Sequence, residues 1–219
     1  MSGIRIQSFV APGFEENGYL VWRAGAGTAV AVDPGGDGEP MLAALVTEDL
    51  RLEAILLTHA HVDHVEGVAA LKQATRAPVH LHPADRPLYD AAADQAAWFG
   101  MRIRPLPPID HDLAHGQLLN AAGLAFEVRH VPGHSPGHVI LYCAEAGAAL
   151  VGDVIFSGSI GRTDLPGGNF TQLVKGIRQH VFTLPGNTVL YTGHGPPTQV
   201  GHERATNPFL VPHHGGGLA

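Results

Sequence analysis

The chain has 219 residues, of which 45% are hydrophobic and 15% charged, a composition that excludes an intrinsically disordered protein. Its formal net charge of −7 disfavours a nucleic-acid partner, because a negative surface repels the phosphate backbone. No stretch reaches the roughly 18 uninterrupted apolar residues of a membrane span, and the start lacks the apolar run of a signal peptide, so we predict no membrane partner.

The first half of the chain is predicted to alternate strands and helices. Apolar alternation bounded by Gly and Pro turns indicates strands, and apolar residues at helical spacing indicate helices. The predicted elements are strands at Ile4–Val10, 17–22 and Thr28–Val32, a helix at 40–50, a strand at 53–57, a helix at 62–74, a strand at Val79–Leu81 and a helix at 84–99.

The second half begins with an expected Pro-rich loop at 102–116. It continues with predicted strands at 124–131, 138–143 and 148–151, a helix at 170–180 and a strand at 189–191. Strands in two batches, each followed by helices, predict two sheets with helices outside them. We expect one domain over residues 1–212, followed by a flexible Gly-rich tail at 213–219.

Three imidazoles and one carboxylate are concentrated directly after the predicted strand at 53–57. The segment is Thr58-His59-Ala60-His61-Val62-Asp63-His64. Imidazole nitrogen and carboxylate oxygen are ligands that Zn²⁺ and similar ions take in catalytic sites. This segment could contribute His59 and His61 to one ion, and Asp63 and His64 to a second. Four ligands cannot complete two coordination shells, so more donors are required elsewhere.

Three further donors stand where such donors are needed. Each follows an apolar predicted strand in a Gly-flanked turn, and they are His134, Asp153 and His194. Loops held by a rigid scaffold are where sites are commonly built. We therefore expect these three side chains to meet those of residues 59–64.

The complete donor set resembles that of the metallo-β-lactamase-fold hydrolases, in the family's order from Asp33-Pro34-Gly35 to His194. The resemblance implies an α+β fold, a four-layer αββα sandwich with the metal site at one edge between the two sheets. It implies two divalent metal ions, Zn with Fe or Mn as alternatives. The implied ligands are His59, His61 and His134 for metal one, Asp63, His64 and His194 for metal two, and Asp153 as the bridge.

Segments 152–156, 161–168 and 202–209 resemble the short, single-domain branch of the type II glyoxalases, the hydroxyacylglutathione hydrolases. This implies an enzyme that hydrolyses a small-molecule thioester, S-D-lactoylglutathione or a related hydroxyacylglutathione, by attack of a metal-bridging hydroxide. Asp63 would also be catalytic by orienting that nucleophile, and Asp33 would accept an N–H from a ligand histidine. The longer enzymes have a C-terminal helical domain that helps to hold glutathione, whereas only 25 residues follow His194 here.

One departure from the longer enzymes concerns the substrate. Arg162-Thr163-Asp164 stands where those enzymes have a Lys-Phe-Tyr stretch that contacts glutathione. Arg162 could still pair with a substrate carboxylate, whereas Asp164 would repel an anion or orient Arg162. The resemblance therefore leaves glutathione specificity open and supports thioester chemistry more firmly.

Other functions remain as alternatives. A persulfide dioxygenase on the same scaffold would share residues 161–164 and use one Fe(II) held by His59, His134 and Asp153. Class B β-lactamases often have a Cys where Asp153 stands, so the carboxylate disfavours that activity. A metal-binding or interaction module without catalysis would be expected to lack a ligand, and none is missing.

The remaining histidines and the cysteine lie outside the donor set. His130 and His138 flank the His134 turn, and either could support that ligand. A metal pair at His80 and His82 is disfavoured, because no third ligand is nearby. Cys143, the one cysteine, is predicted to be a core residue. With no intrachain disulfide possible, a reducing, cytoplasmic location is predicted. The oligomeric state is not determined by the sequence.

Overall fold

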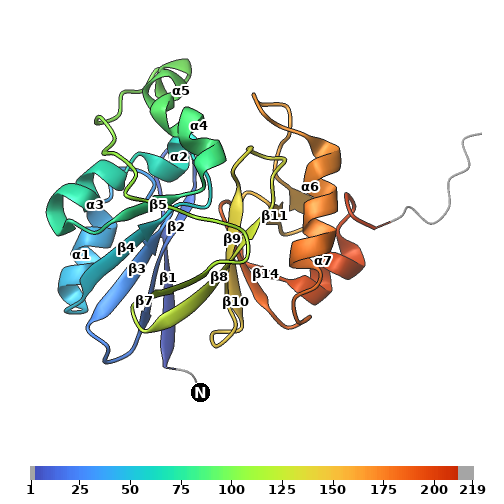
Figure 1. Cartoon of the computed structure of the whole chain (residues 1–219), viewed down its shortest axis with the longest axis horizontal. Coiled ribbons are helices and arrows are strands. Elements are labelled where there is room, and N and C mark those ends of the chain that lie inside the picture. Colours follow the sequence, from blue (N-terminus) through green and yellow to red (C-terminus); the bar gives the residue numbers. More distant parts are fainter. Residues whose placement is uncertain (1–2, 212–219) are drawn as a thin grey trace, which may run out of the picture.

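The computed structural model describes residues 3–211 and places two six-stranded sheets face to face with helices on both outer sides (Figure 1). The first sheet is ordered β1 (Ile4–Val10), β2 (Asn17–Arg23), β3 (Thr28–Val32), β4 (Arg51–Leu56), β5 (Val79–Leu81) and β6 (His111–Asp112). The second is ordered β14 (Thr198–Gln199), β13 (Val189–Thr192), β10 (Ala148–Gly152), β9 (Val139–Cys143), β8 (Leu124–His130) and β7 (Leu118–Ala121). The strands β11 (Ile155–Phe156) and β12 (Ser159–Ile160) form a separate hairpin.

Helices cover the outer face of each sheet, which gives the predicted αββα layering (Figure 1). The first sheet is covered by α1 (Glu39–Thr47), α2 (Val62–Val65), α3 (Val68–Thr75), η1 (Pro83–Asp85), α4 (Arg86–Asp90) and α5 (Ala92–Trp98). The second sheet is covered by α6 (Phe170–Gly176), the π-helical η2 (Ile177–Val181) and α7 (Val200–Thr206). Among residues 3–211, no helix has both the length and the apolar character required to cross a bilayer.

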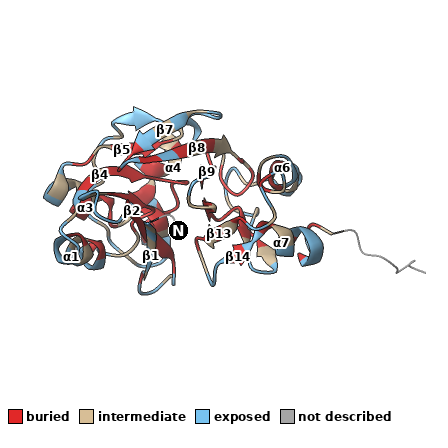
Figure 2. Ribbon diagram, turned by 90° about the horizontal axis from the view of Figure 1, so that it is seen from below, coloured by how far each residue is buried: buried red, intermediate tan, exposed pale blue. Residues whose placement is uncertain are grey.

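Three apolar clusters fill the spaces between the four layers. The middle cluster joins the inner faces of the two sheets, with Val30 and Leu56 from one and Phe126 and Leu141 from the other, all fully buried. The outer clusters join each sheet to its own helices. Figure 2 shows the same pattern, with buried strands inside and exposed surfaces on the outer helices.

Strand direction determines where the donor loops lie. The strands β3, β4 and β5 are parallel neighbours, and β10 is parallel to β13. The carboxyl ends of parallel neighbouring strands share one edge of a sheet. The loops that follow these strands therefore meet where the two sheets face each other.

The predicted helices at 62–74 and 84–99 are each interrupted in the structure. The first ends at Val65 and resumes at Val68, because Gly67 N donates to Pro34 O (2.8 Å) rather than continuing one helix. The second divides around Ala91, where the Gln95 amide donates to Leu88 O (2.7 Å). Helical spacing alone could not predict these tertiary bonds.

Several short elements were not predicted. The strands β7, β11, β12 and β14 and the helix α7 were missed, and β6 forms inside the segment expected to be a loop. In α7 the buried positions are Val200 and Glu203, so there is no apolar stripe to indicate a helix. The tail predicted at 213–219 lies outside the described residues.

Candidate metal centre

The seven predicted donors lie together at the edge between the two sheets. After β4, the loop carries His59 and His61 and the helix α2 carries Asp63 and His64. The other three donors follow strands of the second sheet. Six of the seven side chains form two groups of three in which the potential ligand atoms lie within 4.8 Å of one another. The groups are His59, His61 and His134, and Asp63, His64 and His194.

The first group is made of imidazoles alone. His61 Nδ1 and His134 Nε2 are 2.8 Å apart, and the His59 ring packs edge-on against both neighbours. All three residues are buried, and His59 is fully so. Three converging ring nitrogens are a donor set that suits a borderline divalent ion.

The second group combines a carboxylate with two imidazoles. Asp63 Oδ2 is 3.2 Å from His194 Nε2 and 3.7 Å from His64 Nε2. His194 is the most exposed of the three, with 31% of its side chain accessible, so this group lies nearer to solvent. An isolated bridge between Glu16 and His194 ties the last loop to the start of β2.

Asp153 lies between the two groups. Its Oδ2 is 3.4 Å from His134 Nε2 in the first group and 3.6 Å from His194 Nε2 in the second, and its Oδ1 is 3.4 Å from His64 Nε2. One carboxylate therefore lies within 3.6 Å of ring nitrogens from both donor sets.

Hydrogen bonds at the opposite ring nitrogen orient three of the histidines. His134 Nδ1 is 2.8 Å from Arg162 O, and His59 Nδ1 is 3.1 Å from Thr58 Oγ1. His64 Nδ1 is 3.1 Å from Asp33 Oδ2, which also accepts from the Thr58 hydroxyl (2.6 Å). Such contacts fix the ring tautomer and leave Nε2 facing the centre.

The electrostatics of the imidazoles favour metal binding in the first group. Burial holds the pKa of His59 well below its usual range, and burial together with His134 lowers the pKa of His61 to about 3. Neutral imidazole is the form that binds a metal. Burial also opposes protonation of His64, but Asp63 and Asp153 outweigh it and raise its pKa, which reflects a strongly negative second group.

Buried atoms without partners show that the centre fits cations. Among residues 3–211, His59 Nε2, His64 Nε2 and Asp153 Oδ1 are buried and form no hydrogen bond. Such atoms are unfavourable in a folded protein unless something binds them. Their convergence on two donor groups matches the requirement of divalent metal ions.

Asp85 is a residue of this centre that the sequence interpretation missed. It is fully buried in η1, its Oδ2 accepts from Ser135 Oγ (2.7 Å) and Ala60 N (3.1 Å), and its Oδ1 accepts from Gly137 N (2.5 Å). It thus joins the loop of His59 and His61 to that of His134. The available signal was its position, since His82-Pro83-Ala84-Asp85 follows β5 as the donor loops follow their own strands.

Asp85→Asn is expected to loosen both loops while preserving side-chain size. Each carboxylate oxygen of Asp85 accepts a backbone N–H, one from Ala60 and one from Gly137. The side-chain NH2 of Asn cannot accept, so one of these buried N–H groups loses its partner, which destabilises the fold by about 1–3 kcal/mol. Urea unfolding and metal content measure the effect, and Asp90→Asn on the exposed side of α4 is the control. Equal unfolding free energies for Asp85→Asn and the parent would contradict this role.

Arg162 lies beside the centre with its side chain directed to solvent. Its guanidinium forms two hydrogen bonds with the Asp164 carboxylate, at 2.7 and 2.8 Å, and its side chain is 60% exposed. Its backbone oxygen supports His134, as described above. Two residues anchor the hairpin that precedes it: Glu203 in α7 accepts from Gly158 N (3.1 Å), and Asn207, which follows α7, donates to Ser159 O (2.9 Å).

The other histidines occupy different places. His138 is fully buried, stacks on His59 with ring centroids 4.5 Å apart, and accepts from Asp153 N (3.0 Å), so it does contact two of the donors. His130 stacks on His82 at 4.0 Å, away from the donor groups. Among the described residues, His80 and His82 belong to none of the potential metal groups.

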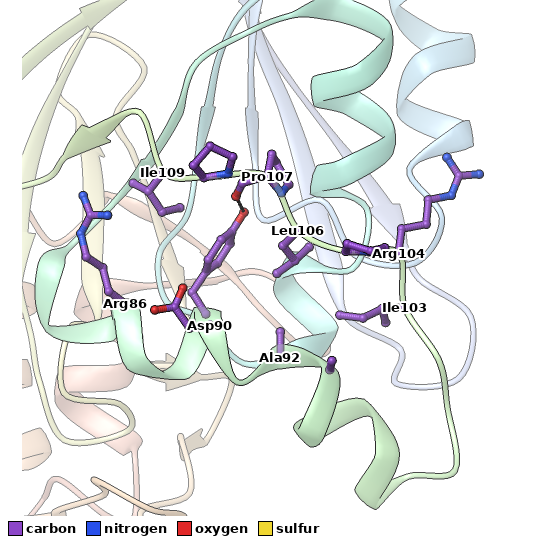
Figure 3. Close-up of a pocket in the computed structure, with 12 residues that line it drawn as sticks. Arg86, Asp90, Ala92, Ile103, Arg104, Leu106, Pro107 and Ile109 are labelled. Atoms are coloured by element: carbon purple, nitrogen blue, oxygen red, sulfur yellow. Dashed lines mark hydrogen bonds between the residues drawn. The ribbon is translucent and has the colours of Figure 1, made fainter.

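A separate hollow of about 550 Å³ lies between α4 and the segment 103–109 (Figure 3). Tyr89 lines the hollow and donates from its hydroxyl to Pro107 O (2.9 Å). The apolar lining includes Ile103, Leu106 and Ile109. None of the seven donors lines it. The centre is therefore distinct from this hollow.

Comparison with known proteins identifies the fold family. The sequence model of the Metallo-beta-lactamase superfamily matches residues 11–194, a span that contains every donor. The chain belongs to the metallo-β-lactamase superfamily. This confirms the family inferred from the motif, and with the donor groups it implies that the protein binds divalent metal ions.

Three known proteins are similar over nearly the whole chain. The hydroxyacylglutathione hydrolase GloC of Haemophilus influenzae is 36% identical, with 94% of this chain and 98% of GloC covered. The crystal structure of the BLEG-1 B3 metallo-β-lactamase has a TM-score of 0.89 and 38% identity, covering 95% of this chain and all of that one. The crystal structure of TTHA1623 in a di-iron-bound form has a TM-score of 0.85 and 43% identity, covering 93% and 100%.

Proposed function

We propose that this protein is a binuclear metal-dependent hydrolase of thioesters, with S-D-lactoylglutathione or a related hydroxyacylglutathione as the substrate. The observation that carries the proposal is the pair of donor groups joined by Asp153. The similarity to GloC, which bears the name hydroxyacylglutathione hydrolase, supports the substrate class.

The proposed ligands are His59, His61 and His134 for one ion, and Asp63, His64 and His194 for the other. Asp153 would bind both ions. When bound, two such ions lower the pKa of a water molecule toward neutrality and polarise the carbonyl of the substrate.

The side chains supply orientation and proton handling. Asp63 Oδ2 lies at the more exposed group, 3.2 Å from His194 Nε2. Its proposed role is to accept a hydrogen bond from the attacking water. Thr58 and Asp33 hold the rings of His59 and His64 so that the Nε2 atoms face the reacting centre. Fixed donors that need no rearrangement during the reaction lower its barrier.

Arg162 is the proposed contact for a substrate carboxylate. Its guanidinium can bind a carboxylate through two parallel hydrogen bonds, as it already binds Asp164. An anionic substrate would have to compete with Asp164 for this cation. We therefore expect weak selectivity for glutathione relative to other anionic thiols.

We propose zinc as the metal, with iron or manganese as alternatives, because imidazole and carboxylate donors accept all three. The di-iron form of TTHA1623 supports iron as a real competitor. A cytoplasmic location is also proposed, and the buried free thiol of Cys143 is in keeping with a reducing compartment.

The test combines elemental analysis of the purified protein with a substrate panel. The panel contains S-D-lactoylglutathione, a coenzyme A thioester, a simple aryl thioester, a β-lactam and glutathione persulfide with oxygen uptake recorded. We expect two metal ions per chain and fastest turnover of the glutathione thioester. One iron per chain with oxygen uptake would replace the proposal by the persulfide dioxygenase, and hydrolysis of the β-lactam alone would replace it by a β-lactamase.

A further inference from the structure

Glu16 is a buried carboxylate for which the proposed mechanism has no use. It immediately precedes β2, and its side chain is fully buried. Neither carboxylate oxygen has a hydrogen-bond partner among residues 3–211. Burial raises the pKa of this carboxyl well above its usual range, so the charged form of Glu16 requires a compensating interaction.

The surroundings of Glu16 direct it toward the second donor group. Its Oε1 lies 3.6 Å from His64 Nδ1, the same atom that lies 3.1 Å from Asp33 Oδ2. Space for it is left by Gly35, where a Cβ would overlap Glu16 Oε2. The nearest potential cationic group is thus a proposed ligand of the more exposed ion.

The charge of this region is unbalanced without metal. Four carboxylates gather around His64, and they are Glu16, Asp33, Asp63 and Asp153. Within residues 3–211, no lysine or arginine forms an ion pair with any of them. Divalent cations at the donor groups would supply positive charge to these carboxylates.

We propose that Glu16 is a positioning residue whose buried charge, acting through His64, holds the second divalent ion and destabilises the metal-free chain. The inference rests on the proposed binuclear centre and assigns Glu16 a role outside the ligand set. A residue retained for this reason improves metal binding while it opposes folding of the apoprotein, whereas a residue retained for packing improves both.

Glu16→Gln tests the inference because it removes the charge and preserves the shape. Competition between the protein and a chromophoric chelator for Zn²⁺ measures both dissociation constants. We expect the second ion to bind about 10–100-fold more weakly, with the first ion unchanged. Thermal unfolding of the metal-free proteins supplies the other readout, and we expect the apo variant to melt at a higher temperature than the apo parent.

Glu15→Gln is the matched control, since Glu15 is the adjacent exposed carboxylate. It should change neither dissociation constant. Glu16→Leu serves as a second variant. An apolar side chain of similar size should also raise the melting temperature of the metal-free chain and weaken binding of the second ion.

Unchanged dissociation constants for Glu16→Gln would overturn the inference. A lower melting temperature of both apo variants, or failure of both to fold, would also overturn it by showing that Glu16 has a structural role. A parent chain that binds only one ion would instead remove the binuclear centre. The parent therefore tests the proposed function and the variants test Glu16.

Discussion

Asp63→Ala is expected to reduce turnover of S-D-lactoylglutathione by about 1,000-fold or more. The change removes a proposed ligand of the second ion and the carboxylate that would orient the attacking water, and loss of a positioned proton acceptor alone commonly reduces a rate by about 100- to 10,000-fold. Steady-state kinetics and metal content of the variant provide the measurement. Because orienting the attacking water stabilises the transition state rather than the bound substrate, we expect the loss in kcat more than in KM.

The control for this variant is Asp94→Ala, which removes an exposed carboxylate from α5. It should leave both turnover and metal content at the parent's values. Near-normal turnover of Asp63→Ala with two metal ions still bound would eliminate the proposed mechanism, because no other residue has been assigned the task of orienting the nucleophile.

Gly193→Ala is expected to disable the centre without altering any donor. A Cβ at this position would overlap Asp153 Oδ1 and lie 2.7 Å from His64 Cε1, so the proposed bridging carboxylate and a ligand of the second ion must both move. Displacement of reacting groups by about 1 Å can reduce a rate about 100-fold. We expect a loss of at least about that size, accompanied by loss of the second ion, measured by kinetics and elemental analysis.

Gly186→Ala is a matched control for this substitution. A Cβ there would meet Arg204 Nη2 at 3.5 Å and Gly201 Cα at 3.8 Å, which are ordinary contacts. It should preserve activity and stability. If Gly193→Ala retained full activity and two metal ions, Asp153 would not lie where both ions need it.

Each donor residue was predictable because the signal for it lies in its immediate sequence neighbourhood. Imidazoles and carboxylates at the ends of apolar strands stand out, as His59, His61, Asp63 and His64 do after β4. The order of the layers was also predictable, since strand and helix periodicity determine which faces are apolar and must be buried. These features depend on near neighbours in the chain.

The groups that hold the donors in place depended on tertiary structure. Asp85 joins loops around residues 60 and 135, and Asp33 spans from the end of β3 to His64. The role proposed for Glu16 could not be predicted from the sequence, because only the fold brings its carboxylate beside His64. An Asp or Glu in the sequence carries no record of which distant donor or charge it will meet, because that pairing is created by the packing of strands far apart in the chain.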